Sequence, residues 1–169
     1  MSGTPGKGTK GEPPWRGGAD TMGSTYHSIQ YHITFSTRDR RRWITPEVQE
    51  KLQRYLGGII KGEGGVLREI GGIEDHVHLL IRWRTDAKLS DLMMRLKSKS
   101  SKWIHETFPD LRDFRWQEGY AAFSVSQSQV ARVKMYIARQ REHHQRQDFQ
   151  CELRGLLTAH GVEYDRRYL

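Results

Sequence analysis

The stretch IEDHVHLLIRW, residues 73–83, decides the fold of this chain, because it combines a strand pattern with two histidines. Side chains at positions i and i+2 of a strand point to the same face. His76 and His78 therefore share one face with Glu74, and the intervening aliphatic side chains share the other. The stretch predicts a central strand with one apolar face for a core and one polar face that carries metal-binding groups.

The residues upstream predict a strand and then a helix. From Tyr26 to Ser36 apolar side chains alternate with polar ones, as a half-buried strand requires. Thr45 and Pro46 are typical of a helix start, and apolar residues recur at helical spacing up to about Lys61.

The remaining elements follow from helix caps, glycine breaks and apolar spacing. They are, in chain order, a strand at 66–70 joined through a turn or bulge at Gly71-Gly72 to residues 73–83, a basic amphipathic helix opened by Ser90-Asp91, an aromatic strand or bent ribbon at 114–125, a helix at about 127–146 capped by Ser126 with Gln129, and a short helix ended by Gly161. The order strand, helix, strand, strand, helix, strand predicts the split βαβ, or ferredoxin-like, α+β fold, followed by two extra helices. Because this fold hosts RNA binders, metal binders and enzymes alike, only the site can indicate the activity.

Composition divides the chain into two parts. Residues 1–23 hold seven of the 17 glycines and three of the five prolines, so we expect a disordered extension. Residues 24–169 are then one domain, long enough for a core without disulfides. The single cysteine, Cys151, excludes an internal disulfide and a multi-cysteine zinc site.

Charge favours a polyanionic partner. The formal net charge is +8 at pH 7, and residues 1–23 contribute only +1 of it. The basic character therefore belongs to the domain, and nucleic acid is the commonest partner for such a protein, although a basic surface alone would give the same charge. No apolar stretch is long enough to cross a bilayer, so we expect no membrane contact and a cytoplasmic location.

A second group of polar residues falls on the helix predicted at 127–146. Tyr136 and Gln140 stand four residues apart, and His143 and His144 continue the same side. A packing stripe of aliphatic residues lies beside them, so a buried structural tyrosine fits the pattern as well as a nucleophile does. A phenol with an ordinary pKa near 10 needs help to ionise at neutral pH, which a nearby divalent cation can supply.

The histidine pair alone is weak evidence for a metal, since two packed or surface histidines give the same spacing. With imidazole, carboxylate or amide ligands and no thiolate, a divalent Mg²⁺ or Mn²⁺ ion fits better than structural zinc. Four cations of the basic helix could contact DNA phosphates or simply form a solvated face; they are Arg95, Lys97, Lys99 and Lys102.

Residues 73–80, 116–120, 123–126 and 136–144 together resemble the single-tyrosine transposases of peel-and-paste insertion sequences, which include the REP-associated tyrosine transposases. His76-Val77-His78 resembles their His-hydrophobic-His motif, and the resemblance covers about residues 26–169.

The resemblance implies a ferredoxin-like nuclease in which His76, His78 and Gln140 hold a divalent ion. Tyr136 would attack single-stranded DNA with hairpin ends, leaving a 5′-phosphotyrosine and a free 3′-hydroxyl. It also implies a homodimer whose tyrosine helix can complete the site of the partner. Glu74, His143 and His144 are candidates for residues that contact the metal ligands without binding the ion themselves.

Three functions therefore compete. The first is a transposase that cuts and rejoins single-stranded DNA. The second is a domesticated or noncatalytic protein of the same fold that binds nucleic-acid hairpins. The third is a metal-dependent phosphodiesterase that uses water in place of the phenol. A covalent protein–DNA adduct distinguishes the first from the other two.

Overall fold

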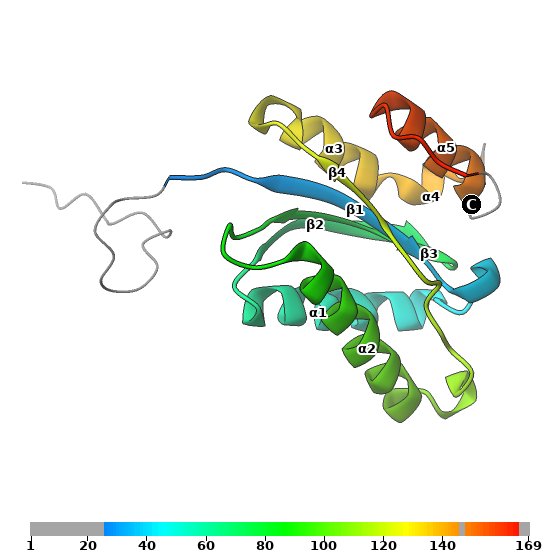
Figure 1. Cartoon of the computed structure of the whole chain (residues 1–169). Helices are drawn as coiled ribbons and strands as arrows, with labels where there is room; N and C mark the ends of the chain where they lie inside the picture. Colours follow the sequence, from blue (N-terminus) through cyan, green and yellow to red (C-terminus); the bar gives the residue numbers. More distant parts are fainter. Residues whose placement is uncertain (1–25, 146–147, 166–169) are drawn as a thin grey trace, which may run out of the picture.

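The computed structural model describes residues 26–145 and 148–165 of the chain. The extension predicted at residues 1–23 lies outside the described residues. Four strands form one sheet, with helices on both of its faces (Figure 1).

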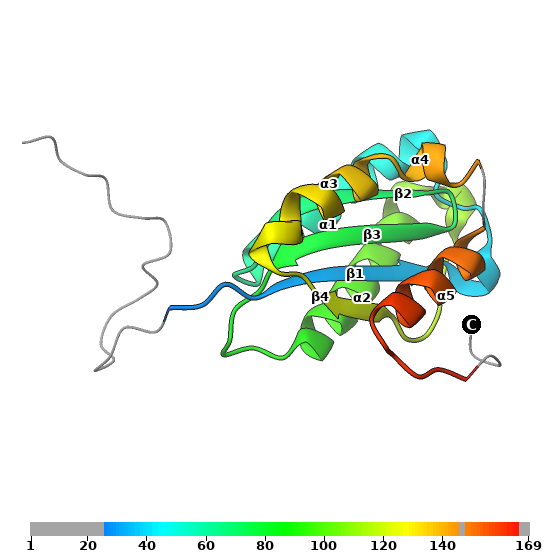
Figure 2. The ribbon, with the colours of Figure 1, turned by 90° about the horizontal axis from the view of Figure 1, so that it is seen from above.

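The elements occur in the predicted order. They are β1 (Gln30–Ser36), α1 (Pro46–Gly62), β2 (Val66–Ile73), β3 (His76–Arg82), α2 (Leu89–Thr107), β4 (Ala121–Ser124), α3 (Val130–Ala138), α4 (Gln140–His143) and α5 (Phe149–Ala159), with 3₁₀ turns at Arg38–Arg40, Pro109–Leu111 and Gln127–Gln129. The strands lie in the order β2-β3-β1-β4, and each neighbouring pair is antiparallel (Figure 2). This order confirms the ferredoxin-like prediction.

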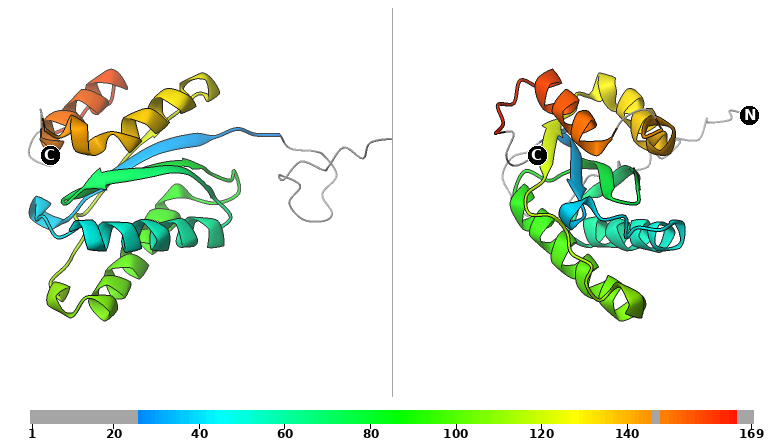
Figure 3. Two further views of the ribbon diagram at one scale, coloured as in Figure 1. Left: turned by 180° about the vertical axis from the view of Figure 1, so that it is seen from behind. Right: turned by 90° about the vertical axis from the view of Figure 1, so that its right-hand side faces the viewer.

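Helices α1 and α2 cover one face of the sheet and enclose the main core (Figure 3). The strands contribute the aliphatic residues that alternate with the histidines of β3, such as Val77, Leu79 and Ile81. Helix α1 begins as predicted, because the Thr45 hydroxyl caps Val48 N and Pro46 occupies the first turn.

Helices α3, α4 and α5 lie over the opposite face, so the prediction of a half-buried first strand was wrong. The polar residues Gln30, His32 and Thr34 of β1 are as buried as their apolar neighbours. A small apolar cluster of Leu80, Val125 and Ile137 packs beneath α3. The polar face of β1 and β3 is therefore a buried surface, which makes its polar groups part of a closed site.

The hairpin turn was also misplaced. Gly71 and Gly72 lie inside β2, and the turn consists of Glu74 and Asp75. Gly71 permits close packing of α3, since a Cβ there would lie 2.2 Å from the Ile137 carbonyl oxygen. Gly72 has φ +141°, which disfavours an L side chain. Gly71 therefore lets the helix that carries Tyr136 lie against the sheet, whereas a Cβ at Gly72 would meet the β3 backbone at His76.

We expect Gly71→Ala to destabilise the protein by about 1–3 kcal/mol, because the added methyl group must displace α3. Guanidinium unfolding monitored by circular dichroism measures this change. Gly58→Ala is the matched control, since Gly58 lies in α1 and a Cβ there meets no atom within 4 Å. Its expected effect is neutral or slightly stabilising. Equal stability of the two variants would show that Gly71 does not set the position of α3.

The long helix predicted at 127–146 is interrupted. Residues 127–129 form a 3₁₀ turn, α3 ends at Ala138, and α4 starts at Gln140. The predicted capping box is absent, because the Ser126 hydroxyl contacts the Ser128 hydroxyl instead of the helix backbone. Among the described residues, none of the helices is both long and apolar enough to cross a bilayer.

Candidate metal and nucleophile site

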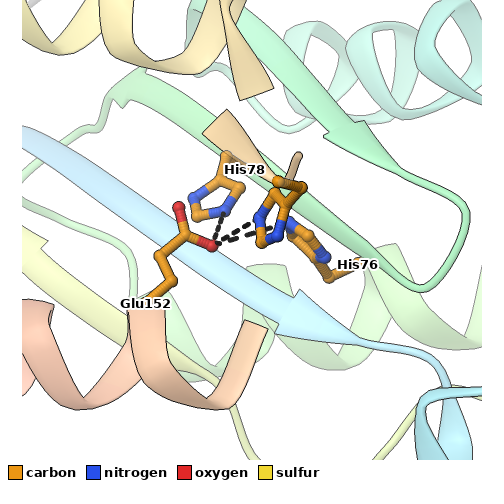
Figure 4. A group of neighbouring side chains, drawn as sticks. His76, His78 and Glu152 are labelled. Carbon is orange, nitrogen blue, oxygen red and sulfur yellow. Dashed lines mark hydrogen bonds and ion pairs between the residues drawn. The ribbon is translucent and has the colours of Figure 1, made fainter. Parts of the chain in front are cut away.

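Three parts of the chain meet on the polar face of the sheet. Strand β3 supplies His76 and His78, α3 and α4 supply Tyr136 and Gln140, and α5 supplies Glu152. Figure 4 shows the Glu152 carboxylate directed at the two strand histidines. All of these side chains except the partly exposed Tyr136 are buried. The predicted strand and helix residues therefore do converge, within a single subunit.

Hydrogen bonds orient both strand histidines in the same way. His76 Nδ1 donates to Asp75 Oδ1 at 2.7 Å, and His78 Nδ1 lies 2.9 Å from His32 Nε2. When each Nδ1 carries the proton, each Nε2 presents a lone pair to the space between β3 and α5. Within the described residues His78 Nε2 is buried and has no hydrogen-bond partner. Metal-binding histidines are typically held by such contacts at the other ring nitrogen.

Glu152 connects the nucleophile candidate with the histidines. Its Oε1 accepts hydrogen bonds from the Tyr136 hydroxyl and, at 2.8 Å, from Gln140 Nε2. Its Oε2 lies 2.9 Å from His144 Nε2 and 3.4 Å from His78 Nε2. One carboxylate oxygen thus serves the phenol and the amide, and the other faces the imidazoles.

The site keeps His32 and His78 neutral and the Glu152 carboxylate charged. Burial lowers the pKa of His78 to about 4 and that of His32 to about 3. Burial alone would raise the pKa of Glu152, but the contacts with His144, His78 and Tyr136 outweigh it and hold this pKa well below its usual range. Burial, together with the Glu152 charge, raises the pKa of Tyr136 above its usual value.

The lowered pKa values of His32 and His78 predict that the stability of the protein depends on pH. In the unfolded chain they bind protons below pH 6.5, whereas in the folded protein they do so only near pH 3 to 4. The unfolded state therefore gains protons first, and stability falls as the pH decreases. Between pH 7 and pH 5, with chelator present, we expect a loss of about 4 kcal/mol for the pair.

Guanidinium unfolding at both pH values measures this loss. His32→Gln cannot take up the proton, so the variant should lose only about half as much stability over the same interval. An unfolding free energy that does not change from pH 7 to pH 5 would contradict the neutral, buried state of these rings.

The structure separates the residues predicted to lie behind the ligands. His144 joins the cluster directly, and His143 Nε2 lies 3.9 Å from Glu152 Oε1 at the edge of the site. Glu74 belongs to the hairpin turn and pairs with Arg42 at 3.2 Å. It does not reach the histidines, because β3 begins at His76, and the strand alternation that placed Glu74 on their face does not extend into the turn.

The four cations predicted to contact DNA lie on α2, which covers the other face of the sheet (Figure 3). Arg95 and Lys99 pair with Glu63, and Lys102 lies 3.8 Å from Glu106. Lys97 donates to the Gln117 and Gly119 carbonyl oxygens, which anchors the segment leading into β4. These cations are therefore not at the histidine cluster.

Sequence reasoning missed three residues of the site: His32, Asp75 and Glu152. His32 was assigned to the polar face of a half-buried strand, and Asp75, which lies in the hairpin turn, was given no role. Glu152 did carry a signal, because it lies three residues after Phe149 and four before Leu156, on the apolar side of the last helix. A carboxylate in that position requires a buried partner.

The donor atoms fit a metal ion. Among the described residues, His76, His78, His144 and Glu152 each offer one atom, and these atoms lie within 4.8 Å of one another. Nitrogen and oxygen donors without thiolate suit a divalent ion and differ from the cysteine ligands of most structural zinc sites. The unpartnered Nε2 of His78 and the buried negative charge of Glu152 are the features that such an ion would satisfy.

Comparison with known proteins identifies the family. The family model described as "Transposase IS200 like" matches residues 25–140, more than half of the chain. The chain belongs to the IS200-like transposase family. The matched segment contains the strand histidines, Tyr136 and Gln140, and it ends before His144 and Glu152.

The matches to curated relatives of this IS200-like transposase cover most of the length of each relative. The transposase for insertion sequence element IS200 from Salmonella typhimurium is 28% identical over 132 residues, which are 75% of this chain and 86% of the relative. The ISDra2 transposase TnpA from Deinococcus radiodurans is 24% identical over 121 residues, which are 69% of this chain and 86% of the relative.

Solved structures share the fold. A crystal structure described as a transposase from Deinococcus radiodurans R1 has a TM-score of 0.59 and 24% identity, and the match covers 72% of this chain and 98% of that one. A REP-associated tyrosine transposase bound to a REP hairpin has a TM-score of 0.56 and 13% identity, with 75% and 74% covered.

Proposed function

We propose that this IS200-like transposase cleaves and rejoins single-stranded DNA through attack of Tyr136 on a phosphodiester. One observation carries the proposal: the Tyr136 hydroxyl donates to Glu152, the carboxylate that also faces the strand histidines. The phenol is therefore held at the edge of a group of metal-binding atoms, which is the arrangement that assisted nucleophilic attack requires.

A divalent ion, Mg²⁺ or Mn²⁺, belongs to this proposal. His76 and His78 would hold it through Nε2, and the family resemblance implies Gln140 as an oxygen donor. When bound, the ion would polarise the scissile phosphate and neutralise charge that develops on it.

The proton of the Tyr136 hydroxyl has an acceptor within the site. Because burial raises the pKa of Tyr136, the phenol does not ionise unaided at neutral pH. Glu152 Oε1 accepts its hydrogen bond and is placed to receive the proton as the tyrosine oxygen bonds to phosphorus. The bond between phosphorus and the 3′-oxygen of the preceding nucleotide breaks, and the leaving 3′-oxygen takes a proton from solvent to become the free hydroxyl. Reversal of these steps on another strand rejoins DNA without ATP, because the tyrosine linkage retains the energy of the phosphodiester.

A groove beside the site supports access by a single strand. It encloses about 610 Å³ between α5 on one side and, on the other, the end of β1 and residues 117–121, and Arg40 and Tyr120 are among its lining residues. Phe149 lines the groove and stacks on His76, with ring centroids 4.4 Å apart. Exposed aromatic and cationic groups of this kind suit unpaired bases and phosphates.

Hairpin ends on the DNA and a homodimer remain predictions for this chain. The structural neighbour bound to a REP hairpin supports the first of them. Sedimentation of the protein with and without hairpin DNA tests the second.

The test is incubation with labelled single-stranded hairpin DNA and Mg²⁺ or Mn²⁺, followed by a denaturing gel. A shifted, covalently labelled protein band is the expected result. Salt-sensitive binding without cleavage would instead indicate a noncatalytic hairpin-binding protein. Cleaved DNA without a protein adduct would indicate hydrolysis by water.

A further inference from the structure

Glu152 lies outside the segment matched by the family model, yet its carboxylate lies within 4 Å of the polar atoms of Tyr136, Gln140, His144 and both strand histidines. It is 2% exposed and comes from α5. A buried carboxylate requires a positive or hydrogen-bonding partner at each of its oxygens.

The distances at Glu152 Oε2 are those of atoms that share an ion. Oε2 lies 3.4 Å from His78 Nε2 and 3.7 Å from His76 Nε2. Two donors bound to one ion at about 2.1 Å, at angles between octahedral and tetrahedral, lie about 3.0–3.4 Å apart. A direct N–H···O hydrogen bond has a typical length of about 2.9 Å. The distance from Oε2 to His78 Nε2 therefore fits two ligands of the same ion. The distance from Oε2 to His76 Nε2 would have to shorten by a few tenths of an ångström.

The two ends of the Gln140 amide face different groups. Its Nε2 donates to Glu152 Oε1 at 2.8 Å, and its Oε1 lies 3.3 Å from His76 Nε2. A reversed amide would direct its carbonyl oxygen at the carboxylate, which is repulsive. The Tyr136 hydroxyl binds the same Oε1. Two donors on Oε1 and one from His144 on Oε2 thus hold the carboxylate in place.

We propose that Glu152 is an anionic oxygen ligand of the divalent ion, bound through Oε2 beside His76 and His78. Gln140 positions this carboxylate through Nε2, while its own Oε1 faces His76. This inference rests on the proposed function for the presence of the ion. An anionic oxygen is a stronger ligand for Mg²⁺ or Mn²⁺ than a neutral amide oxygen. The same carboxylate then links the ion to the nucleophile, because Oε1 holds the Tyr136 hydroxyl.

The test is titration of the full chain with Mn²⁺ alone, without DNA, with free Mn²⁺ measured by electron paramagnetic resonance. Glu152→Gln preserves the shape but removes the charge, and we expect it to weaken Mn²⁺ binding at least tenfold. The matched control is Glu142→Gln, since Glu142 is an exposed carboxylate on α4. It should bind Mn²⁺ within twofold of the parent. Gln140→Ala should weaken binding less than Glu152→Gln does.

The reverse order would overturn the inference: unchanged Mn²⁺ affinity in Glu152→Gln with a large loss in Gln140→Ala would make the amide the ligand. If Glu152→Gln does not fold, as judged by circular dichroism, Glu152→Asp replaces it. This variant withdraws the carboxylate by one methylene, so its Mn²⁺ affinity must still fall well below that of the control.

The adduct assay separates this inference from the proposed function. Mn²⁺ binding that depends on Glu152, in a protein that forms no DNA adduct, would reject the function and retain the ligand. Adduct formation with Mn²⁺ binding that is independent of Glu152 would reject the ligand and retain the function.

Discussion

Tyr136→Phe is expected to abolish the covalent DNA adduct, with a loss of at least about 10⁴-fold, because it removes the attacking oxygen. The ring should keep its edge contacts with the imidazoles of His32 and His78, whose centroids lie 5.8 and 6.0 Å from its own. Folding and hairpin binding should therefore change little. A denaturing gel with labelled hairpin DNA measures the adduct, and a native gel measures binding.

The matched control is Tyr55→Phe. Tyr55 lies on α1 and stacks on Trp103, on the face of the sheet that α1 and α2 cover. Loss of its hydroxyl should leave adduct formation unchanged. An adduct that survives in Tyr136→Phe would show that another residue attacks the DNA, and it would reject Tyr136 as the nucleophile.

His78→Ala is expected to have the second largest effect. The substitution removes the buried Nε2 that has no hydrogen-bond partner among the described residues. Mutation of a residue that hydrogen-bonds a metal ligand typically lowers metal affinity or activity by about 10–100-fold. Mutation of a ligand itself should therefore lower adduct formation by more than about 100-fold. The stabilisation by Mn²⁺ should disappear as well, since an ion that binds only the folded state raises its melting temperature.

Two melting curves, with chelator and with Mn²⁺, test this expectation for each protein. His27→Ala is the control, because His27 is exposed and precedes β1. The parent and this control should both melt at higher temperature with Mn²⁺, whereas His78→Ala should not respond. A preserved Mn²⁺ response in His78→Ala would place the ion elsewhere in the protein.

Local patterns were sufficient for most of the fold. Helix α1 starts and ends within about one residue of the prediction, because its cap, proline and apolar spacing agree with one another. The hairpin turn was misplaced because Gly71 and Gly72 suggest a turn by themselves. Their actual role, the close packing of β2 against α3 and the conformation at φ +141°, depends on elements distant in the sequence.

The polar face of the sheet was harder to interpret. Alternation in β1 correctly separates the two faces, but it does not tell whether the polar face meets solvent or other helices. Helices α3 and α5 cover it, so His32 is buried beside His78 and not solvated. The break at Arg139 between α3 and α4 likewise required the tertiary structure.

The residue pattern identified His76, His78, Tyr136 and Gln140, because strand and helix periodicity place side chains of one element on a common face. Periodicity acts within an element and carries no information about which elements meet. The approach of α5, and with it the position of Glu152 between the phenol and the imidazoles, was decided only by the tertiary structure. The contact between Glu152 and the imidazoles joins residues more than seventy positions apart in the sequence.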